Sequence, residues 1–438
     1  MKNNKIDVLY VHPPHGNDYI IPTGLIGLMN SINCVKMGVM YFEVSDEIIR
    51  NSKIVVMDLY WWFPLAEIGR LARRFKQVNP NIIIIVGGDT ATIFAEIIIK
   101  IFKIDYVIKG DAEFPFRLLV ENLLNSRGVG DVPNLVSKDF ITPQTYSLTI
   151  EDYNRSDCIT IDWFKFFKRR VNYIHSKLKR LAAPHEDVIG YPFIPVLKGC
   201  IYNCSWCYAS LRWRKVLCKN TLVARDHKYV INDLIKCSKD RNISWVYILT
   251  DFVNVLGLNY ANEILSQKYD INFYFKFYNL PSFSTLNKMI ESFNRCFFHF
   301  NIYKNDGQGL EMVDLNYLKE IFKYLKFRNM RWSLYYDSDK MSLKYMKKWQ
   351  REFSELLLGD CKQWKIKIPY PTKDIRHLME QFKMFYRKTT RIAAVNYAIR
   401  KKNYGTSLEA VGRYYWRLKN YDKAAEHFKK VSDLILER

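Results

Sequence analysis

Residues 198–207 read KGCIYNCSWC, and the interpretation of the whole chain starts from them. Cys200, Cys204 and Cys207 follow the spacing Cys-x3-Cys-x2-Cys, and an apolar run at 192–197 predicts a strand that leads into them. Three thiolates this close together can bind three irons of a four-iron cubane and leave the fourth iron without a protein ligand. An open coordination position is typical of a catalytic metal site rather than a structural one. The motif therefore predicts an iron–sulfur cluster that binds a further molecule.

Zinc is the main alternative for this motif, but a structural zinc site needs a fourth Cys or His at a compatible spacing. Neither His185 nor Cys218 lies at such a spacing, so the sequence favours iron. The chain has nine cysteines in 438 residues, and the six outside the motif follow no pattern. Because a chain of this length does not depend on disulfides for stability, we expect reduced thiols and a cytoplasmic location.

The motif, with Trp206 directly before its last cysteine, resembles the signature of the radical S-adenosylmethionine (SAM) superfamily. The resemblance implies a [4Fe–4S] cluster on Cys200, Cys204 and Cys207, whose open iron binds the amino and carboxylate groups of SAM, with Trp206 beside the cofactor. It also implies a one-electron reductant such as flavodoxin or ferredoxin, and cleavage of SAM to a 5′-deoxyadenosyl radical that abstracts hydrogen. The protein's part is then to position the reactants and to exclude water.

The first 125 residues alternate between short apolar runs and amphipathic segments. Near-continuous apolar strands separated by helices predict a parallel sheet that is covered on both faces. Ligands of such sheets bind at the carboxyl ends of the strands, where Gly87, Gly88 and Gly110 follow two of the expected strands. We expect strands at 5–11, 36–42, 53–59, 82–86 and 105–109, and helices at 26–32, 65–78, 94–102 and 116–124.

This order of elements resembles the Rossmann-like cobalamin-binding domain that precedes the barrel of many radical SAM enzymes. The resemblance lies in His-Pro-Pro at 12–14, Pro-Thr-Gly-Leu at 22–25, VGGDTAT at 86–92 and DYVIKGDAE at 105–113. It implies that the backbone approaches the corrin ring at five cofactor-binding residues: Thr23, Gly24, Gly87, Gly88 and Gly110.

Two departures from that family leave cobalamin binding open. The Asp-x-His-x-x-Gly signature that supplies a lower axial histidine is absent, so the cobalt would not be ligated by histidine. After the third strand, residues 60–63 read YWWF where the family has a small polar loop. These rings either line the pocket for the nucleotide tail or fill it, so the alternative is a scaffold that has lost the cofactor.

Residues 191–375 are expected to form a partial (β/α)6 barrel of the TIM type, as the resemblance to the radical SAM superfamily implies. Functional residues of such barrels lie at the carboxyl ends of the strands. Thr250 is therefore a candidate cofactor-binding residue, and Asp251 and Tyr303 are candidate catalytic residues. The alternatives are a helix N-cap for Asp251 and simple packing for Tyr303. The expected strands are 193–198, 245–250, 271–278, 297–303, 331–336 and 363–368, with helices at 227–238, 261–268, 283–293, 316–327 and 343–358.

The predicted organisation has four parts: a sheet domain at 1–125, a linker at 126–190, a barrel at 191–375 and a helical cap at 376–438. The linker interleaves aromatic and basic side chains. That mixture suits an anionic membrane surface, RNA phosphates, or a plain connector whose aromatic side chains are packed. The cap contains a segment similar to half of a tetratricopeptide repeat, which is too little for a solenoid.

The chain has 67 basic and 44 acidic residues and a net charge of +23. This charge favours an acidic partner, so we expect an anionic substrate such as a lipid, an RNA or an acidic peptide, although AT-rich coding also produces basic chains. No window has 18 uninterrupted apolar residues, and the first residues contain no signal-peptide core. We therefore expect neither a membrane span nor secretion.

Together these features predict a radical SAM enzyme. The expected reaction is methyl transfer from methylcobalamin to a carbon radical on the substrate, with a second SAM remethylating the cobalt. One alternative keeps the radical but catalyses cyclisation, rearrangement or C–C coupling, with cobalamin absent or auxiliary. Another is a basic RNA- or membrane-associated protein whose cluster is structural or sensory.

Overall fold

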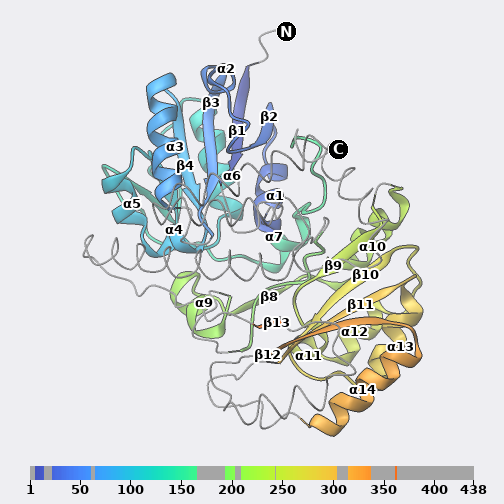
Figure 1. Ribbon diagram of the computed structural model, residues 1–438. Coiled ribbons are helices and arrows are strands. Elements are labelled where there is room, and N and C mark those ends of the chain that lie inside the picture. The colour runs from blue at the N-terminus through green and yellow to red at the C-terminus, as the bar shows by residue number, and fades with distance from the viewer. Residues whose placement is uncertain are drawn as a thin grey trace, which may run out of the picture. The chain divides into compact units, whose positions relative to one another are not determined.

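The computed structural model describes residues 5–13, 22–60, 65–164, 193–202, 209–241, 243–302, 314–336 and 361–362. These residues form two mostly parallel sheets with helices packed on them (Figure 1). The fold is therefore mixed α/β with parallel sheets, as the sequence predicts. Cys204, Trp206, Cys207, Tyr303 and the expected cap at 376–438 lie outside the described residues.

The first sheet has six strands. They span Ile6–His12 (β1), Lys36–Met40 (β2), Ser52–Asp58 (β3), Ile83–Gly87 (β4), Tyr106–Ile108 (β5) and Leu135–Ser137 (β6). Their order is β2-β1-β3-β4-β5-β6, parallel except for the pair β5 and β6. Because the order reverses between β1 and β3, the carboxyl ends of these strands are where a sheet of this topology binds ligands.

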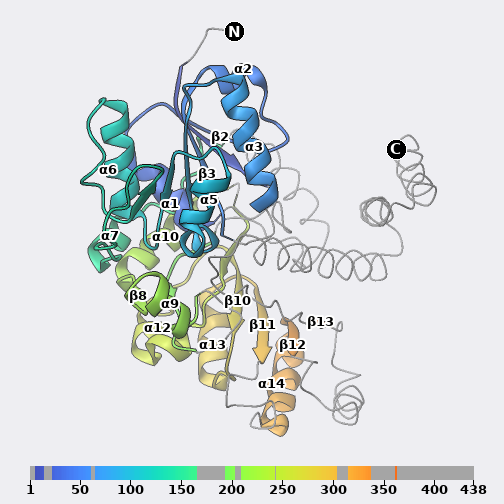
Figure 2. The ribbon, with the colours of Figure 1, turned by 90° about the vertical axis from the view of Figure 1, so that its left-hand side faces the viewer.

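Helices cover both faces of the first sheet. On one face α1 (Thr23–Ser31) packs against α6 (Glu113–Leu124), and on the other α2 (Asp46–Arg50) packs against α3 (Leu65–Val78) (Figure 2). Two short helices, α4 (Asp89–Ile93) and α5 (Ala95–Ile101), follow β4.

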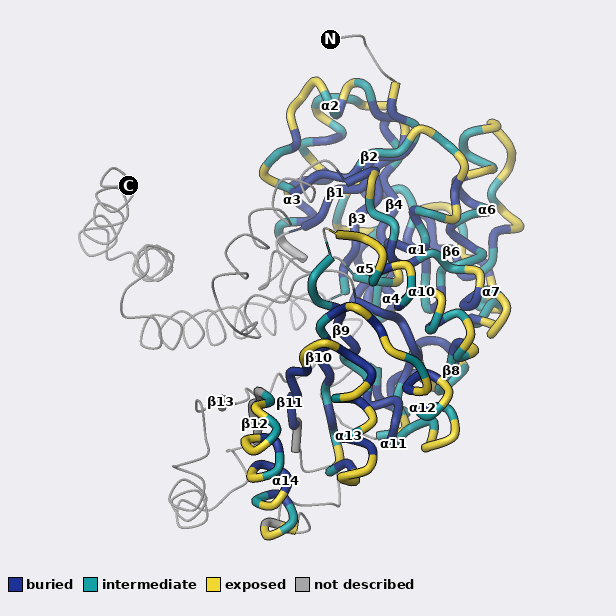
Figure 3. The backbone as a smooth tube through the Cα atoms, turned by 90° about the vertical axis from the view of Figure 1, so that its right-hand side faces the viewer, coloured by how far each residue is buried: buried dark blue, intermediate teal, exposed yellow. Residues whose placement is uncertain are grey.

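Apolar periodicity explains these elements. In α3, Ile68, Leu71, Ala72 and Phe75 are buried, and their spacing of i, i+3, i+4 and i+7 places them on one helical face. Residues 8–11 of β1 are all fully buried, because helices cover the sheet on both sides. Buried strands occupy the centre of this part of the chain, as the burial colours of Figure 3 illustrate.

Within the described residues, the second sheet has five parallel strands in sequential order, β9 to β13. They span Trp245–Ile248 (β9), Asn272–Phe277 (β10), Cys296–Ile302 (β11), Arg331–Tyr336 (β12) and Cys361–Lys362 (β13). The backbone of Phe193 and Ile194 bridges to Tyr247 in β9, so this segment takes the place of the expected first strand. A sequential parallel order is typical of β/α barrels.

In the part of the chain that the structure describes, five helices accompany the second sheet: α10 (His227–Lys239), α11 (Phe252–Leu256), α12 (Leu258–Ile264), α13 (Phe283–Ser292) and α14 (Leu315–Phe327). In β10, Phe273, Phe275 and Phe277 pack in one core with side chains of these helices. Tyr274, which points to the opposite face, packs in the core that includes the first sheet. The alternation along β10 therefore assigns one face of the sheet to its helices and the other to the remainder of the fold.

Four short elements of the described chain lie between the two sheets in sequence: α7 (Ile150–Arg155), β7 (Leu197–Gly199), α9 (Leu211–Leu217) and β8 (Leu222–Ala224), of which β7 and β8 pair antiparallel. In the linker, Trp163 and Phe164 are buried against β2, where a Cβ on Gly38 would lie 2.2 Å from the Phe164 ring. The Trp163 indole also donates to the Asn30 side chain at 2.8 Å. The burial of these two rings agrees with one of the three alternatives for the linker, a connector whose aromatic side chains are packed.

The sequence predicted the long elements well and the short ones poorly. Residues 65–78 and 331–336 have the predicted bounds, whereas α2, α7, α9, α11, β6 and β8, each of seven residues or fewer, were not expected. The strand at 363–368 and the helix at 343–358 lie outside the described residues. Among the helices that the structure describes, none is long and apolar enough to cross a bilayer.

Substitution of Gly88 by alanine should destabilise the fold. Gly88 has φ +106°, and a Cβ there would lie 2.8–2.9 Å from the backbone of Leu59 and Tyr60. We expect Gly88→Ala to lower the free energy of unfolding by about 2 kcal/mol or more. Gly128→Ala, where a Cβ meets nothing within 4 Å, should change it by less than about 1 kcal/mol. Equal midpoints of urea unfolding for the two variants would contradict this account.

Candidate functional site

A cavity of about 650 Å³ lies where the first sheet meets the segment that enters the second, and we call it the central cavity. Its lining is mostly apolar and comes from the carboxyl ends of β3, β4 and β5, the start of α1, α7, β7 and the end of β9. This volume is typical of small-molecule and cofactor sites. The cavity therefore occupies the edge at which a parallel sheet binds its ligands.

Glycine backbone forms the first-sheet side of the central cavity. Thr23 and Gly24 line it at the start of α1, and Gly87, Gly88 and Gly110 line it after β4 and β5. A Cβ on Gly24 would meet nothing within 4 Å, and one on Gly87 only the Ile108 carbonyl at 4.0 Å. The space in front of these two glycines is open, so a large planar ligand can approach the backbone closely.

The opposite side of the cavity belongs to the segment that carries the cysteine motif. Lys198 and Gly199, just before Cys200, and Ala209, just after the motif, line the cavity together with Thr250 at the end of β9. Cys200 is partly buried, and its sulfur accepts a hydrogen bond from the Tyr202 amide at 3.5 Å. The cavity thus brings together six of the seven predicted cofactor-binding residues, the seventh being Trp206, which the structure does not describe.

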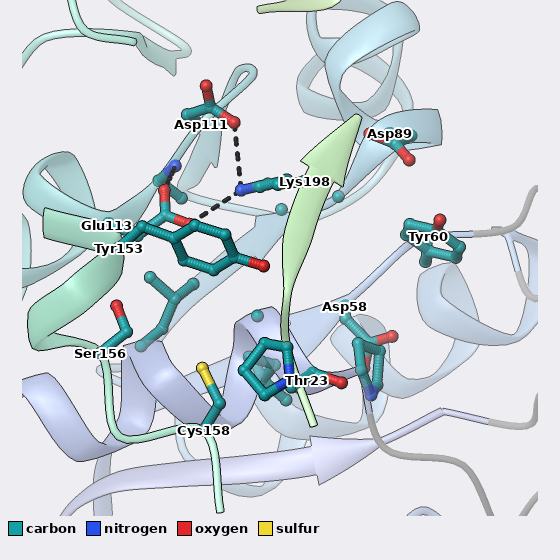
Figure 4. Close-up of a pocket in the computed structure, with 18 of the residues that line it drawn as sticks. Thr23, Asp58, Tyr60, Asp89, Asp111, Glu113, Tyr153, Ser156, Cys158 and Lys198 are labelled. Carbon is teal, nitrogen blue, oxygen red and sulfur yellow. Dashed lines mark hydrogen bonds and ion pairs between the residues drawn. The ribbon is translucent and has the colours of Figure 1, made fainter. Parts of the chain in front are cut away.

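A network of ion pairs joins the two sides. The Lys198 ammonium lies 3.0 Å from the Asp111 carboxylate and 2.8 Å from that of Glu113 (Figure 4). Asp111 and Glu113 follow β5 of the first sheet, whereas Lys198 is in β7. The segment before the cysteines is therefore held to the edge of the first sheet.

Asp111 also binds the segment after the motif. It is fully buried, and Arg214 of α9 donates to both of its oxygens, at 3.1 and 3.2 Å. The Asn220 side chain and the Leu148 amide donate as well, at 3.3 and 2.9 Å. Burial alone would raise the pKa of Asp111, but the charges of Lys198 and Arg214 and these hydrogen bonds outweigh it and hold the pKa well below its ordinary range.

A second buried polar cluster lies at the ends of β1 and β3. The Tyr10 hydroxyl donates to Asp58 at 2.6 Å and lies 2.7 Å from Nδ1 of His12. Tyr10 and His12 are fully buried, and Asp58 lines the cavity. Tyr60, the first of the four aromatic residues expected near the nucleotide tail, also lines the cavity, and the other three lie outside the described residues.

Asp251 has a different environment from Thr250. It is buried, does not line the central cavity, and caps α11 through the Asn254 amide. Its carboxylate also accepts hydrogen bonds from the Asn254 side chain at 2.7 Å and from the amides of Tyr278 and Asn279 at 2.7 and 3.2 Å. The structure thus gives Asp251 the N-cap role that was its alternative, and a catalytic role remains only a prediction.

Sequence reasoning did not single out Asp58, Asp89, Asp111, Tyr153, Lys198 or Arg214 as site residues. Asp89 and Asp111 lie inside the runs that carried the resemblance, and Lys198 precedes the motif, so their positions after strands were a usable signal. Tyr153 and Arg214 lie in short helices that the pattern did not predict. Only the three-dimensional arrangement relates them to the site.

Comparison with known proteins gives a fold and no sequence match. No protein-family model matches the chain, and no curated protein does either. The chain is similar to the structure of the radical S-adenosylmethionine methyltransferase TsrM from Kitasatospora setae with cobalamin and a [4Fe–4S] cluster bound. The TM-score is 0.57 and the identity 13%, over 80% of this chain and 73% of TsrM.

A further similar structure is the cobalamin-dependent S-adenosylmethionine radical enzyme OxsB with aqua-cobalamin and S-adenosylmethionine bound. Here the TM-score is 0.53 and the identity 10%, over 88% of this chain and 56% of OxsB. At these identities the likeness shows that the chain shares the mixed α/β fold of the two proteins.

The residues present fit the cofactors that the sequence resemblance implies. The open backbone at Gly24 and Gly87 and the apolar walls suit a corrinoid, whose large ring needs close approach without side chains. Gly199 places Cys200 next to the same cavity, and thiolates are the usual ligands of iron–sulfur clusters.

Removal of the Asp111 carboxylate should destabilise the protein severely. Asp111→Ala leaves the Lys198 and Arg214 cations without their shared partner, and we expect a loss of about 3–5 kcal/mol in the free energy of unfolding. Asp46→Ala breaks an exposed pair with Arg74 at 2.8 Å and should cost less than about 1 kcal/mol. Chemical denaturation measures both values, and similar losses in the two variants would refute the assigned importance of the network.

Asp89 should make stability depend on pH. It lines the cavity at the start of α4, and burial raises the pKa of its carboxyl to about 6. Because the folded state disfavours the ionised form, this group lowers stability as pH rises from about 4 to 6. Asp89→Asn should therefore be more stable than the wild type by roughly 2 kcal/mol at pH 7.5.

The gain in Asp89→Asn should shrink as the pH of the unfolding measurement is lowered towards 5. Asp131→Asn, in an exposed loop, is the matched control and should change stability by less than about 0.5 kcal/mol at both pH values. A gain that is independent of pH would show that the charge of Asp89 is not its cause.

Proposed function

We propose that this protein is a cobalamin-dependent radical SAM enzyme that transfers a methyl group to a carbon atom of its substrate. The observation that carries the proposal is the central cavity, which is lined by the open glycines of the first sheet, by the residues that flank the cysteine motif and by Thr250. A corrinoid on one side and a cluster with SAM on the other would then face each other across one space. The fold shared with TsrM and OxsB supports the same reading.

The three-cysteine motif and the sheet edge have separate parts in this proposal. Cys200, Cys204 and Cys207 would hold the cluster, and Thr23, Gly24, Gly87, Gly88 and Gly110 the corrinoid. When bound, the cluster supplies the electron that cleaves SAM, and the corrinoid carries the methyl group. Residues 1–125 would accordingly serve the corrinoid and 191–375 the cluster and SAM.

The protein's own side chains position these groups. Asp111 fixes Lys198 before the motif and Arg214 after it, so both ends of the cysteine segment are anchored to the first sheet. Asp251 acts as a positioning residue, because its bonds to the amides of Tyr278 and Asn279 tie the end of β9, where Thr250 lies, to the end of β10. The apolar walls exclude water from the space between.

The remaining assignments of partner and location are part of the proposal. A flavodoxin or ferredoxin would deliver the electron. The charge of +23 favours an anionic substrate. The protein would act in the cytoplasm.

Anaerobic purification and assay test this function directly. The reduced wild-type protein should contain about four irons per chain and release 5′-deoxyadenosine from SAM. Cys204→Ala should lose both the visible absorbance of the cluster and the cleavage of SAM. Cys34→Ala, whose thiol follows α1 and does not line the cavity, should keep both.

Methyl transfer has its own readout. After incubation with SAM labelled in its methyl group, mass spectrometry of the extracted corrinoid should detect the label. If the protein contains the cluster but releases no 5′-deoxyadenosine under reductant, a structural or sensory role of the cluster is favoured instead. If the purified protein contains zinc alone, the proposal is wrong.

A further inference from the structure

Tyr153 presents an unbonded hydroxyl to the central cavity. The residue lies in α7, is 7% exposed, and packs with Leu148 and Val223 while the Arg225 guanidinium lies 5.9 Å from its ring centre. Its hydroxyl points away from Glu113 and into the space between the labelled side chains (Figure 4). Among the described residues, that hydroxyl has no hydrogen-bond partner.

The Tyr153 hydroxyl thus faces the cavity without a partner among the described residues. Buried polar groups are nearly always hydrogen-bonded, and an exception calls for an explanation such as a missing ligand. Three other tyrosines that are buried or partly buried have bonded hydroxyls: Tyr10 to Asp58 at 2.6 Å, Tyr260 to the Arg225 carbonyl at 2.7 Å and Tyr269 to the Ile264 carbonyl at 2.8 Å.

The Tyr153 hydroxyl is a donor at neutral pH. Burial raises the pKa of this phenol above its ordinary value, so the proton stays on the oxygen. A hydroxyl that lines the cavity without a protein partner can donate to whatever fills the cavity, and a carbonyl oxygen is the simplest acceptor.

The segment that contains Tyr153 reaches the corrinoid side of the cavity, because α7 contacts α6 of the first sheet as well as β8. Ser156 and Cys158, from the same segment, lie against α1, where a Cβ on Gly27 would be 3.0 Å from the Cys158 sulfur and 3.4 Å from the Ser156 Cβ. Gly27 is one helical turn beyond the open Gly24. Thr250 and the end of β9 belong to the other side.

We propose that the Tyr153 hydroxyl donates a hydrogen bond to the carbonyl oxygen of a peripheral amide on the corrin ring. The inference rests on the proposed function, because it needs a corrinoid in the central cavity. A corrin ring carries amide side chains around its edge. A hydroxyl on the cavity wall near the glycines of the first sheet can therefore donate to an amide carbonyl oxygen of the ring. The hydroxyl would then be unbonded in the empty protein and bonded in the complex.

This assignment predicts opposite effects on stability and on binding. Tyr153→Phe removes only the hydroxyl and keeps the ring that packs with Leu148 and Val223. In the ligand-free protein it breaks no hydrogen bond to a described residue, so the melting temperature should stay equal to or exceed that of the wild type. In the complex it removes a hydrogen bond, so the Kd for a corrinoid should rise roughly threefold to tenfold.

Titration of the full-length, ligand-free chain tests this. Hydroxocobalamin and cobinamide, which keeps the peripheral amides but lacks the nucleotide tail, are added separately while protein fluorescence quenching is measured. Tyr153→Phe should weaken the binding of both ligands. The matched control is Tyr269→Phe, which loses a hydroxyl bonded within the other sheet's core and should lower the melting temperature without changing either Kd.

The outcomes separate this inference from the proposed function. If the wild-type chain binds neither corrinoid, the proposed cofactor is wrong, and the proposed hydrogen bond is then wrong as well. If the wild type binds both and Tyr153→Phe binds them equally well, only the contact is wrong. Weaker binding of hydroxocobalamin with unchanged binding of cobinamide would also overturn it, because the partner would then lie on the nucleotide tail.

Discussion

The buried carboxylate of Asp111 is the interaction on which the site depends. Its cationic partners Lys198 and Arg214 lie on either side of the cysteine motif, whereas Asp111 itself extends from the first sheet. A buried ion network adds little stability beyond what packed apolar side chains would give, but only one geometry satisfies all its members. The network therefore fixes how the cysteine segment meets the sheet edge, and the central cavity is the space that this arrangement encloses.

The polar groups around that cavity fall into two kinds. Asp111 and Asp251 are saturated with donors from distant parts of the chain, so they orient backbone and neighbouring side chains. The side chains of Asp89 and Tyr153 have no hydrogen bond to a described residue, although both line the cavity. Unbonded groups lower the stability of the empty protein, and folds retain such groups chiefly where a ligand completes them.

The sequence predicts what depends on local pattern and misses what depends on distant contacts. Apolar runs and helical periodicity located the long strands and helices, and glycines after strands located one wall of the cavity, because both signals lie within a few residues. The pairing of Asp111 with Arg214 spans 103 residues and leaves no such signal. Short helices such as α7, which carries Tyr153, complete less than two turns and show no period to detect.

Thr250 and Asp251 illustrate the limit most clearly, since the sequence offers both as residues at the carboxyl end of one strand. β9 ends at Ile248, and alternation along the strand no longer decides where the next side chains lie. What decides is the neighbouring strand: β10 ends beside them and presents the amides of Tyr278 and Asn279, which bind the Asp251 carboxylate. Asp251 is thereby withdrawn from the cavity and Thr250 is left to line it. A position at a strand end thus predicts proximity to the ligand, whereas the donors that surround a side chain determine whether it is available to react.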